Sequence, residues 1–91
     1  MKVLIDNKIF YLEGCLNEYG LYVNLFHINY EYRGIGLSYS IWRNLQDKYK
    51  VDINLQAFFT LISYYKKMGF TDLGMADDLG YHDFILKYKT K

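Results

Sequence analysis

The strongest structural signal in this sequence is a change of hydrophobic period on either side of a glycine pair. Before the pair, residues 21–32 are rich in β-branched, aromatic and other apolar side chains, which is typical of a strand. After it, from Leu37, apolar residues recur every three or four positions, which predicts an amphipathic helix of about three to four turns. Gly34 and Gly36 lie between the two patterns. The sequence thus predicts a strand that turns directly into a helix.

The rest of the chain predicts five more strands and one more helix. Together with 21–32, the expected strands are residues 2–5, 9–14, 51–57, 70–75 and 81–88. The first expected helix starts at Leu37, and the second runs from Phe58 to Met68. Gly69 follows the second helix and suits its C-terminal cap. Because a helix separates 21–32 from 51–57, these two strands are expected to be parallel. The predicted fold is α/β (α+β), a mixed and mostly antiparallel sheet with two main helices in the order β-β-β-α-β-α-β-β.

Length and composition exclude several classes of function. With 91 residues, 52% of them hydrophobic, the chain fits one packed domain over residues 1–91. A formal net charge of +1 is far from the basic balance that nucleic-acid binding requires, so no nucleic-acid partner is expected. No apolar run approaches the roughly 20 residues that cross a bilayer, so we expect a cytoplasmic protein without a membrane partner. The single cysteine, Cys15, excludes an intrachain disulfide, and its apolar neighbours predict a buried position.

The predicted glycine joint has the properties of an anion-binding site. The first N–H groups of a helix lack partners within the helix and lie at the positive end of its dipole. Gly34 and Gly36 carry no Cβ that would keep a diphosphate away from these donors, Arg33 adds a positive charge and Ser38 a hydroxyl. The simpler alternative is that the glycines only permit a sharp turn. A dinucleotide fingerprint is excluded because Tyr39 stands where its third glycine belongs, and the lysine-bearing loop of nucleotide hydrolases is missing.

Two sequence blocks around this joint resemble the GNAT family of N-acetyltransferases. The first is Arg33-Gly34-Ile35-Gly36-Leu37-Ser38, which is similar to the family signature of Arg or Gln, two residues, Gly, one residue, and Gly or Ala. The second is Tyr64-Tyr65-Lys66-Lys67-Met68-Gly69-Phe70, at the end of the second helix. The chain departs from the family in Ser38, in Phe58 and Leu61 where Asn and Ala are common, and in lacking the opening strand and helical pair of many members.

The resemblance implies an acyl-CoA N-acyltransferase-like fold and acetyl transfer from acetyl-CoA to an amine. It implies that the main chain of Phe26, His27 and Ile28 pairs with the pantetheine arm and polarises the thioester carbonyl. The diphosphate would then be bound by Arg33, Gly34, Ile35, Gly36, Leu37 and Ser38. Tyr65 would lie near the coenzyme sulfur and act as general acid, with a purely structural place in the core as the alternative.

The residue that removes the amine proton is not evident from the sequence. Family members often carry a carboxylate in the middle of the third strand, whereas residues 23–26 contain none. His27 is the nearest ionisable group and His82 lies near the last strand, and each is either a base or a structural residue. No metal site is expected. We expect a protein lysine or N-terminus as acceptor, with a homodimer as one way to close the groove, and a coenzyme-binding or interaction module without catalysis as the alternative function.

Overall fold

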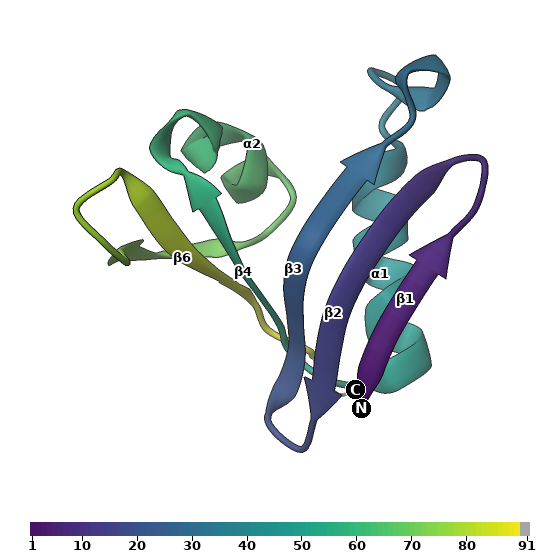
Figure 1. Ribbon diagram of the computed structural model, residues 1–91, viewed down its shortest axis with the longest axis horizontal. Coiled ribbons are helices and arrows are strands. Elements are labelled where there is room, and N and C mark those ends of the chain that lie inside the picture. Colours follow the sequence, from purple (N-terminus) through teal and green to yellow (C-terminus); the bar gives the residue numbers. More distant parts are fainter. Residues whose placement is uncertain (90–91) are drawn as a thin grey trace.

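Six strands form one sheet in the order β1-β2-β3-β4-β6-β5 in the computed structural model, which describes residues 1–89 (Figure 1). In chain order the elements are β1 (Lys2–Asp6), β2 (Phe10–Asn17), β3 (Gly20–Ile28), the 3-10 turn η1 (Tyr30–Tyr32), α1 (Leu37–Tyr49), β4 (Ile53–Phe58), the 3-10 turn η2 (Phe59–Leu61), α2 (Ile62–Lys67), β5 (Thr71–Met75) and β6 (Tyr81–Leu86). Within residues 1–89, only β3 and β4 pair in parallel. The predicted order of strands and helices and the mixed, mostly antiparallel sheet are therefore confirmed.

The parallel pairing of β3 with β4 is short. Its register joins Leu21 to Ile53, Tyr22 to Asn54 and Val23 to Leu55, and it goes no further. Figure 1 shows the two strands in contact at one end and separating toward the other. We call the point after Val23 and Leu55 the ladder end. Beyond it, the sheet consists of two halves, β1-β2-β3 and β4-β6-β5.

A β-bulge lies at the ladder end. On β2, Glu13 and Gly14 are consecutive, but their partners on β3 are Leu25 and Val23, so Asn24 is the extra residue. A bulge of this kind bends the strand and increases its twist, which turns β3 away from β4. Gly14 permits the close approach of the two strands here, because a Cβ on it would lie 2.6 Å from the carbonyl oxygen of Tyr22.

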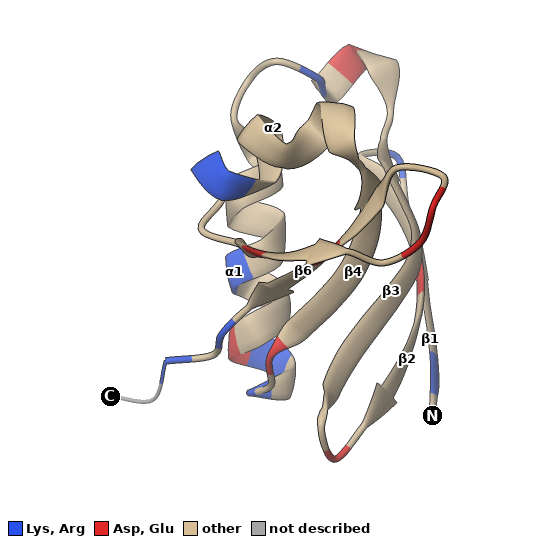
Figure 2. Ribbon diagram, turned by 90° about the vertical axis from the view of Figure 1, so that its left-hand side faces the viewer, with Lys and Arg blue, Asp and Glu red and all other residues tan. Residues whose placement is uncertain are grey.

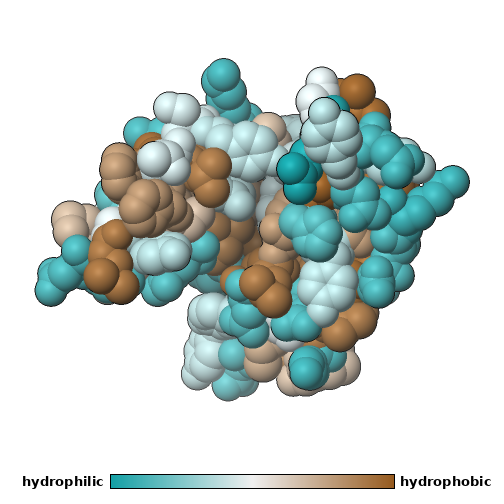
Figure 3. Space-filling model, turned by 45° about the horizontal axis from the view of Figure 1, so that its top comes forward, coloured by the Kyte–Doolittle hydropathy of each residue, from teal (hydrophilic) through white to brown (hydrophobic). Residues whose placement is uncertain are grey.

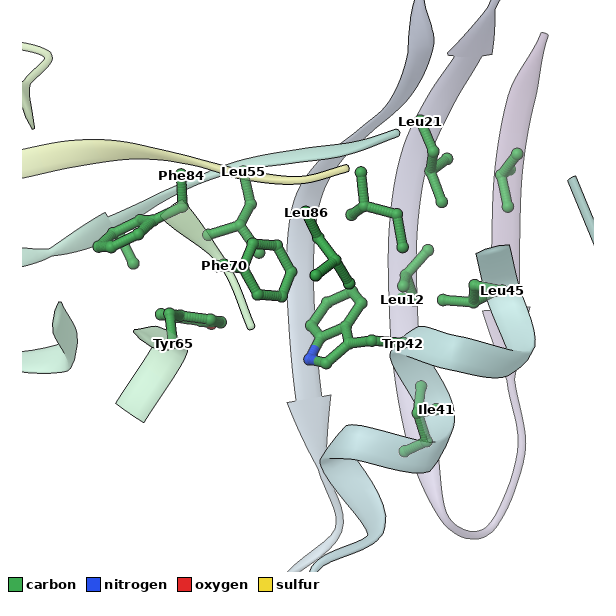
Figure 4. Packing of buried hydrophobic residues seen from close by; sticks show 13 residues of the cluster. Leu12, Leu21, Ile41, Trp42, Leu45, Leu55, Tyr65, Phe70, Phe84 and Leu86 are labelled. Atoms are coloured by element: carbon green, nitrogen blue, oxygen red, sulfur yellow. The ribbon is translucent and has the colours of Figure 1, made fainter. Parts of the chain in front are cut away.

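Both helices pack on the same face of the sheet (Figure 2). The core between them centres on Trp42 of α1, which is fully buried and lies 5.4 Å from Phe70, ring centre to ring centre. Tyr65 of α2 packs on Phe70 and on Phe84 of β6, at 5.4 and 5.3 Å (Figure 4). One hydrophobic cluster therefore joins the two halves of the sheet through the helices. We call the opposite face of the sheet, which neither helix covers, the open face.

Strand β3 ends at Ile28, so the predicted strand over 21–32 is wrong at its end. Its partner β2 begins at Phe10, which pairs with Ile28, and the last main-chain hydrogen bond between the two segments runs from the N–H of Asn29 to the carbonyl oxygen of Ile9. The chain instead forms a 3-10 turn, in which the N–H of Tyr32 donates to the carbonyl oxygen of Asn29 at 2.9 Å.

Two further expectations are corrected by the pairing of the strands. Phe58 belongs to β4 and not to the second helix, because it pairs with Tyr81 and because the N–H of Phe59 donates to Gly80 at 2.8 Å. Cys15 is exposed rather than buried, because the alternation of β2 places it on the open face. A neighbouring strand thus decided the conformation of Phe58, and the uncovered face of the sheet decided the exposure of Cys15.

Candidate functional site

A pocket of about 950 Å³ opens on the helix-covered face, between the end of β3, the start of α1 and α2. We call it the helix-face pocket. Its lining consists of Phe26, His27, Ile28, Tyr32, Arg33, Gly34, Gly36, Leu37, Ser38, Leu61, Tyr64, Tyr65, Lys67 and Met68. Figure 3 looks toward the end of the molecule at which β3 and β4 have separated and shows a hollow between the two halves. Both sequence blocks around the glycine joint thus border one cavity.

The glycine joint leaves the start of α1 open. Gly34 and Gly36 have φ angles of 79° and 78°, in the left-handed region that favours glycine, and a Cβ on either would meet nothing within 4 Å. Gly36 is the N-cap residue, and no side chain in the described part of the protein caps the helix. The N–H groups of the first turn therefore lack side-chain partners and form the positive end of a helix 13 residues long.

The edge of β3 toward β4 forms another wall of the pocket. The N–H of Asn29 donates to Ile9 at 2.8 Å, so Asn29 and, by alternation along the strand, His27 direct their main-chain groups to β2. Phe26 and Ile28 then direct their main-chain groups to the opposite edge, where β3 is no longer paired with β4. The Ile28 carbonyl accepts a hydrogen bond from Nε of Arg33 at 2.7 Å. The main-chain N–H and C=O of Phe26 and the N–H of Ile28 thus remain for a ligand.

The charges around the helix-face pocket are positive. Arg33 approaches it from the glycine joint and Lys67 from the end of α2, where Figure 2 shows basic residues. Among residues 1–89, those that line this pocket include no Asp or Glu. The Nε of Arg33 is held by Ile28, which leaves the other guanidinium N–H groups free to face an anion. A cationic pocket at an uncapped helix N-terminus is suited to a phosphate-bearing ligand.

Two adjacent tyrosines of α2 close the pocket from the other side. The Tyr64 hydroxyl donates to Oγ of Ser38 at 2.6 Å and so ties α2 to the first turn of α1. Tyr65 is 8% exposed, and its burial, together with the neighbouring Tyr64, raises the pKa of its phenol to about 12. Tyr65 therefore stays protonated near neutral pH and is a hydrogen-bond donor at the pocket.

Most of the residues that the sequence singled out border this pocket, and two side chains point elsewhere. Ile35 is 64% exposed and lies outside the lining. The imidazole of His27 stacks on Tyr11 with ring centres 5.8 Å apart. Because Phe26 packs on Trp42 under α1, the alternation of β3 places the His27 ring on the open face.

His82, the other histidine, lies far from the glycine joint in β6. Its Nδ1 is 3.0 Å from Oδ1 of Asp72 on β5, and the hydrogen bond from this imidazole, followed by the N–H of Gly74, lowers the pKa of the Asp72 carboxyl. The pair joins β5 to β6 and does not border the helix-face pocket. This arrangement favours the structural alternative for His82.

Sequence reasoning missed Tyr32, Leu61, Tyr64, Lys67 and Met68 as lining residues. All but Tyr32 and Leu61 belong to the block that resembles the GNAT family, so the block marked the right segment without marking its individual contacts. Tyr32 faces the pocket only because the chain leaves β3 in a 3-10 turn. No pattern in the sequence predicted that Tyr32 would line the pocket.

Within residues 1–89, no helix is both long enough and apolar enough to cross a membrane. Comparison of the chain with protein-family models, with curated proteins and with solved structures found no match.

Proposed function

We propose that this chain is an N-acetyltransferase with an acyl-CoA N-acyltransferase-like fold, which transfers the acetyl group of acetyl-CoA to an amine. The observation that carries the proposal is the uncapped start of α1 behind Gly34 and Gly36, which opens into a cationic pocket. The resemblance of residues 33–38 to the GNAT signature points to the same ligand. A pocket of about 950 Å³ is also in the range that binds an organic cofactor.

The residues around the pocket fit different parts of acetyl-CoA. The diphosphate would contact the first N–H groups of α1 and the charges of Arg33 and Lys67. The free main-chain groups of Phe26 and the N–H of Ile28 would pair with the amides of the pantetheine arm as a neighbouring strand does. This is narrower than the sequence expectation, because His27 pairs with β2 and the Ile28 carbonyl already accepts from Arg33.

In the proposed reaction, the nitrogen of a neutral amine attacks the carbonyl carbon of the thioester. A C–N bond forms and the C–S bond breaks. The nitrogen loses one proton and the coenzyme thiolate gains one, so the products are an amide and a free thiol. A lysine amine with a pKa near 10.4 must first give up its proton, whereas an α-amine with a pKa near 8 does so more readily.

Tyr65 is the proposed donor to the leaving sulfur. A phenol with a pKa of about 12 is protonated at neutral pH, but it is a weaker acid than a thiol with a pKa near 8.5. Tyr65 would therefore stabilise the departing thiolate mainly through a hydrogen bond. His27 remains the candidate base, since its imidazole lies on the open face, from which an acceptor can approach.

The second candidate function is a coenzyme-binding module without turnover. It is favoured by the lining of the helix-face pocket, in which the described part of the chain places no carboxylate to take the amine proton. The two candidates agree on the coenzyme and differ on whether free thiol is released.

Coenzyme binding is tested with Trp42, the only tryptophan, whose ring lies 4.5 Å from Phe26 of the pocket wall. We expect acetyl-CoA to change its fluorescence, with calorimetry as an independent measurement. Gly36→Glu should weaken binding by about 100-fold or more, because it places a carboxylate at the anion site. Gly36→Lys carries the same backbone strain at a φ of 78° and should bind more tightly than Gly36→Glu. A wild-type protein that shows no binding by either method would contradict both candidate functions.

Turnover separates the N-acetyltransferase from the coenzyme-binding module. An N-acetyltransferase should release free thiol when acetyl-CoA and a lysine peptide or a peptide with a free N-terminus are both present. Tyr65→Phe should lower kcat by about 10-fold while leaving the dissociation constant of acetyl-CoA nearly unchanged. Binding without any release of thiol would favour the module, and full activity in Tyr65→Phe would remove Tyr65 from the mechanism.

A further inference from the structure

A second pocket, of about 650 Å³, lies at the ladder end. We call it the open-face pocket. Its lining consists of Tyr22, Val23, Asn24, Asn54, Leu55, Gln56, Leu73, Asp83 and Phe84. Val23 and Leu55 are the last pair of the β3–β4 ladder, and Asn24 and Gln56 are the next residues of each strand. The open-face pocket therefore borders the place where the two strands begin to separate.

The polar side chains of this pocket lie on the open face of the sheet. Ile53, Leu55 and Ala57 of β4 are buried in the core beneath the helices, so Asn54 and Gln56, which alternate with them, point to the other side. Asp83 is paired with Gln56 across the ladder of β4 and β6, and paired residues share a face. A ligand in this pocket would thus approach from the side opposite to the helix-face pocket.

Asp83 gives the pocket its charge. Among residues 1–89, it is the only charged residue in the lining, and it forms no side-chain hydrogen bond or ion pair there. Its partner on β5 is Gly74, where a Cβ would meet nothing within 4 Å, so the space beside the carboxylate is open. Asn24, Asn54 and Gln56 add amide oxygens around it. This set of acceptors suits a cation.

We infer that the open-face pocket binds the amine acceptor and that Asp83 pairs with a second positive charge on it, beside the amine that reacts. This inference rests on the proposed function for the identity of the reaction. A carboxylate paired with the reacting amine would hold it as ammonium, which cannot attack a carbonyl. Asp83 can promote transfer only by binding a cation that does not react. The selected acceptors are therefore amines with a second cationic group, either diamines and polyamines or peptides with a basic residue next to the target lysine.

The test uses acceptor pairs that differ in one charge. 1,5-Diaminopentane is compared with 1-aminopentane, and a lysine peptide flanked by arginine with the same peptide flanked by citrulline. We expect Asp83→Asn to raise KM about 10-fold for the dicationic member of at least one pair, with kcat and the KM of its monocationic partner unchanged. The acceptor pair in which KM changes shows whether the acceptor is a small diamine or a peptide. Asp83→Glu should restore most of the discrimination. Equal KM changes for both members of each pair, or none at all, would overturn the inference.

A binding experiment without acetyl-CoA keeps this inference separate from the proposed function. The side-chain amide signals of Asn24, Asn54 and Gln56 in NMR spectra report on the pocket directly. 1,5-Diaminopentane should shift them at lower concentration than 1-aminopentane, and Asp83→Asn should remove this difference. Charge-selective shifts in a protein that binds no acetyl-CoA would support the cation site while the proposed function fails. Shifts that are the same for both amines would overturn the cation site even if acetyl-CoA binds.

Discussion

Two pockets border the separation of β3 and β4, and their linings differ in charge. The helix-face pocket contains Arg33 and Lys67 and, among residues 1–89, no carboxylate, whereas the open-face pocket contains Asp83 and no basic residue. They also differ in how they are built. The first depends on main-chain groups at a helix start and a strand edge, and the second on residues of four strands. The sheet thus has a positively charged pocket on one face and a negatively charged pocket on the other.

The difference fits the two substrates of the proposed reaction. An anionic coenzyme and a cationic amine would attract each other in solution without reaching a productive geometry. If the coenzyme and the amine each bind on their own face of the sheet, only the thioester and the reacting nitrogen need to meet. They would meet in the region where the main chain of β3 is no longer paired with β4. Orientation of this kind is a large part of the rate enhancement of two-substrate reactions.

Gly14→Ala should disturb both pockets together and produce the largest effect. The new Cβ would lie 2.6 Å from the main-chain oxygen of Tyr22, so the bulge of β3 must shift. We expect the free energy of unfolding to fall by about 2 to 4 kcal/mol, measured by urea denaturation with Trp42 fluorescence. Binding of acetyl-CoA and of 1,5-diaminopentane should both weaken.

The adjacent substitution Cys15→Ala is the matched control, because Cys15 is exposed on the open face. It should change stability by no more than about 0.5 kcal/mol. If Gly14→Ala were as stable as Cys15→Ala and bound both ligands normally, the close contact of β2 and β3 would not be what fixes the ladder end.

Removing the positive charges should affect one pocket only. The double variant Arg33→Gln with Lys67→Gln should weaken acetyl-CoA binding by about 30-fold, and the remaining affinity should depend less on salt. Gln at position 33 still carries a donor for the Ile28 carbonyl, so the end of β3 stays tied. Amine binding in the open-face pocket should be unchanged, as measured by the NMR shifts of its amide side chains.

Lys2→Ala with Lys48→Ala removes the same charge from surfaces outside both pockets and serves as the control. If this pair weakened acetyl-CoA binding as much as the Arg33 and Lys67 substitutions did, the net charge of the protein, and not the pocket, would determine affinity. A loss of amine binding in the Arg33 and Lys67 variant would show that the two faces are not independent.

The local features of this molecule were predictable from the sequence, and the contacts between distant segments were not. The helical period after Leu37 and the need for glycine at positions 34 and 36 are properties of short segments, and α1 and the open joint match them. The end of β3 at Ile28 depends on where β2 begins, and the strand conformation of Phe58 depends on Tyr81. A pattern read along one segment contains no information about its partner.

The open-face pocket illustrates the same limit at the level of function. Asp83 lies in a strand near the C-terminus, and nothing in residues 81–88 distinguishes its carboxylate from a solvated surface charge. It becomes a candidate because the sheet order brings β6 next to β4 and because the bulge at Asn24 moves β3 away. A pattern along one strand therefore gave no reason to select Asp83.

The hydrogen bond between Tyr64 and Ser38 should give the smallest effect, and it tests whether the helix-face pocket depends on side chains as well as on the main chain. Tyr64→Phe removes a donor at 2.6 Å in a half-buried position, so we expect a loss of about 1 kcal/mol of stability and a decrease in acetyl-CoA affinity of about threefold. Tyr19→Phe, in the exposed turn before β3, is the control and should change neither. Combining Tyr64→Phe with Ser38→Ala in a double-mutant cycle isolates the pair. A coupling energy near zero would mean that the start of α1 is held open by its glycines alone, and α2 would then be a wall of the pocket without being a support for it.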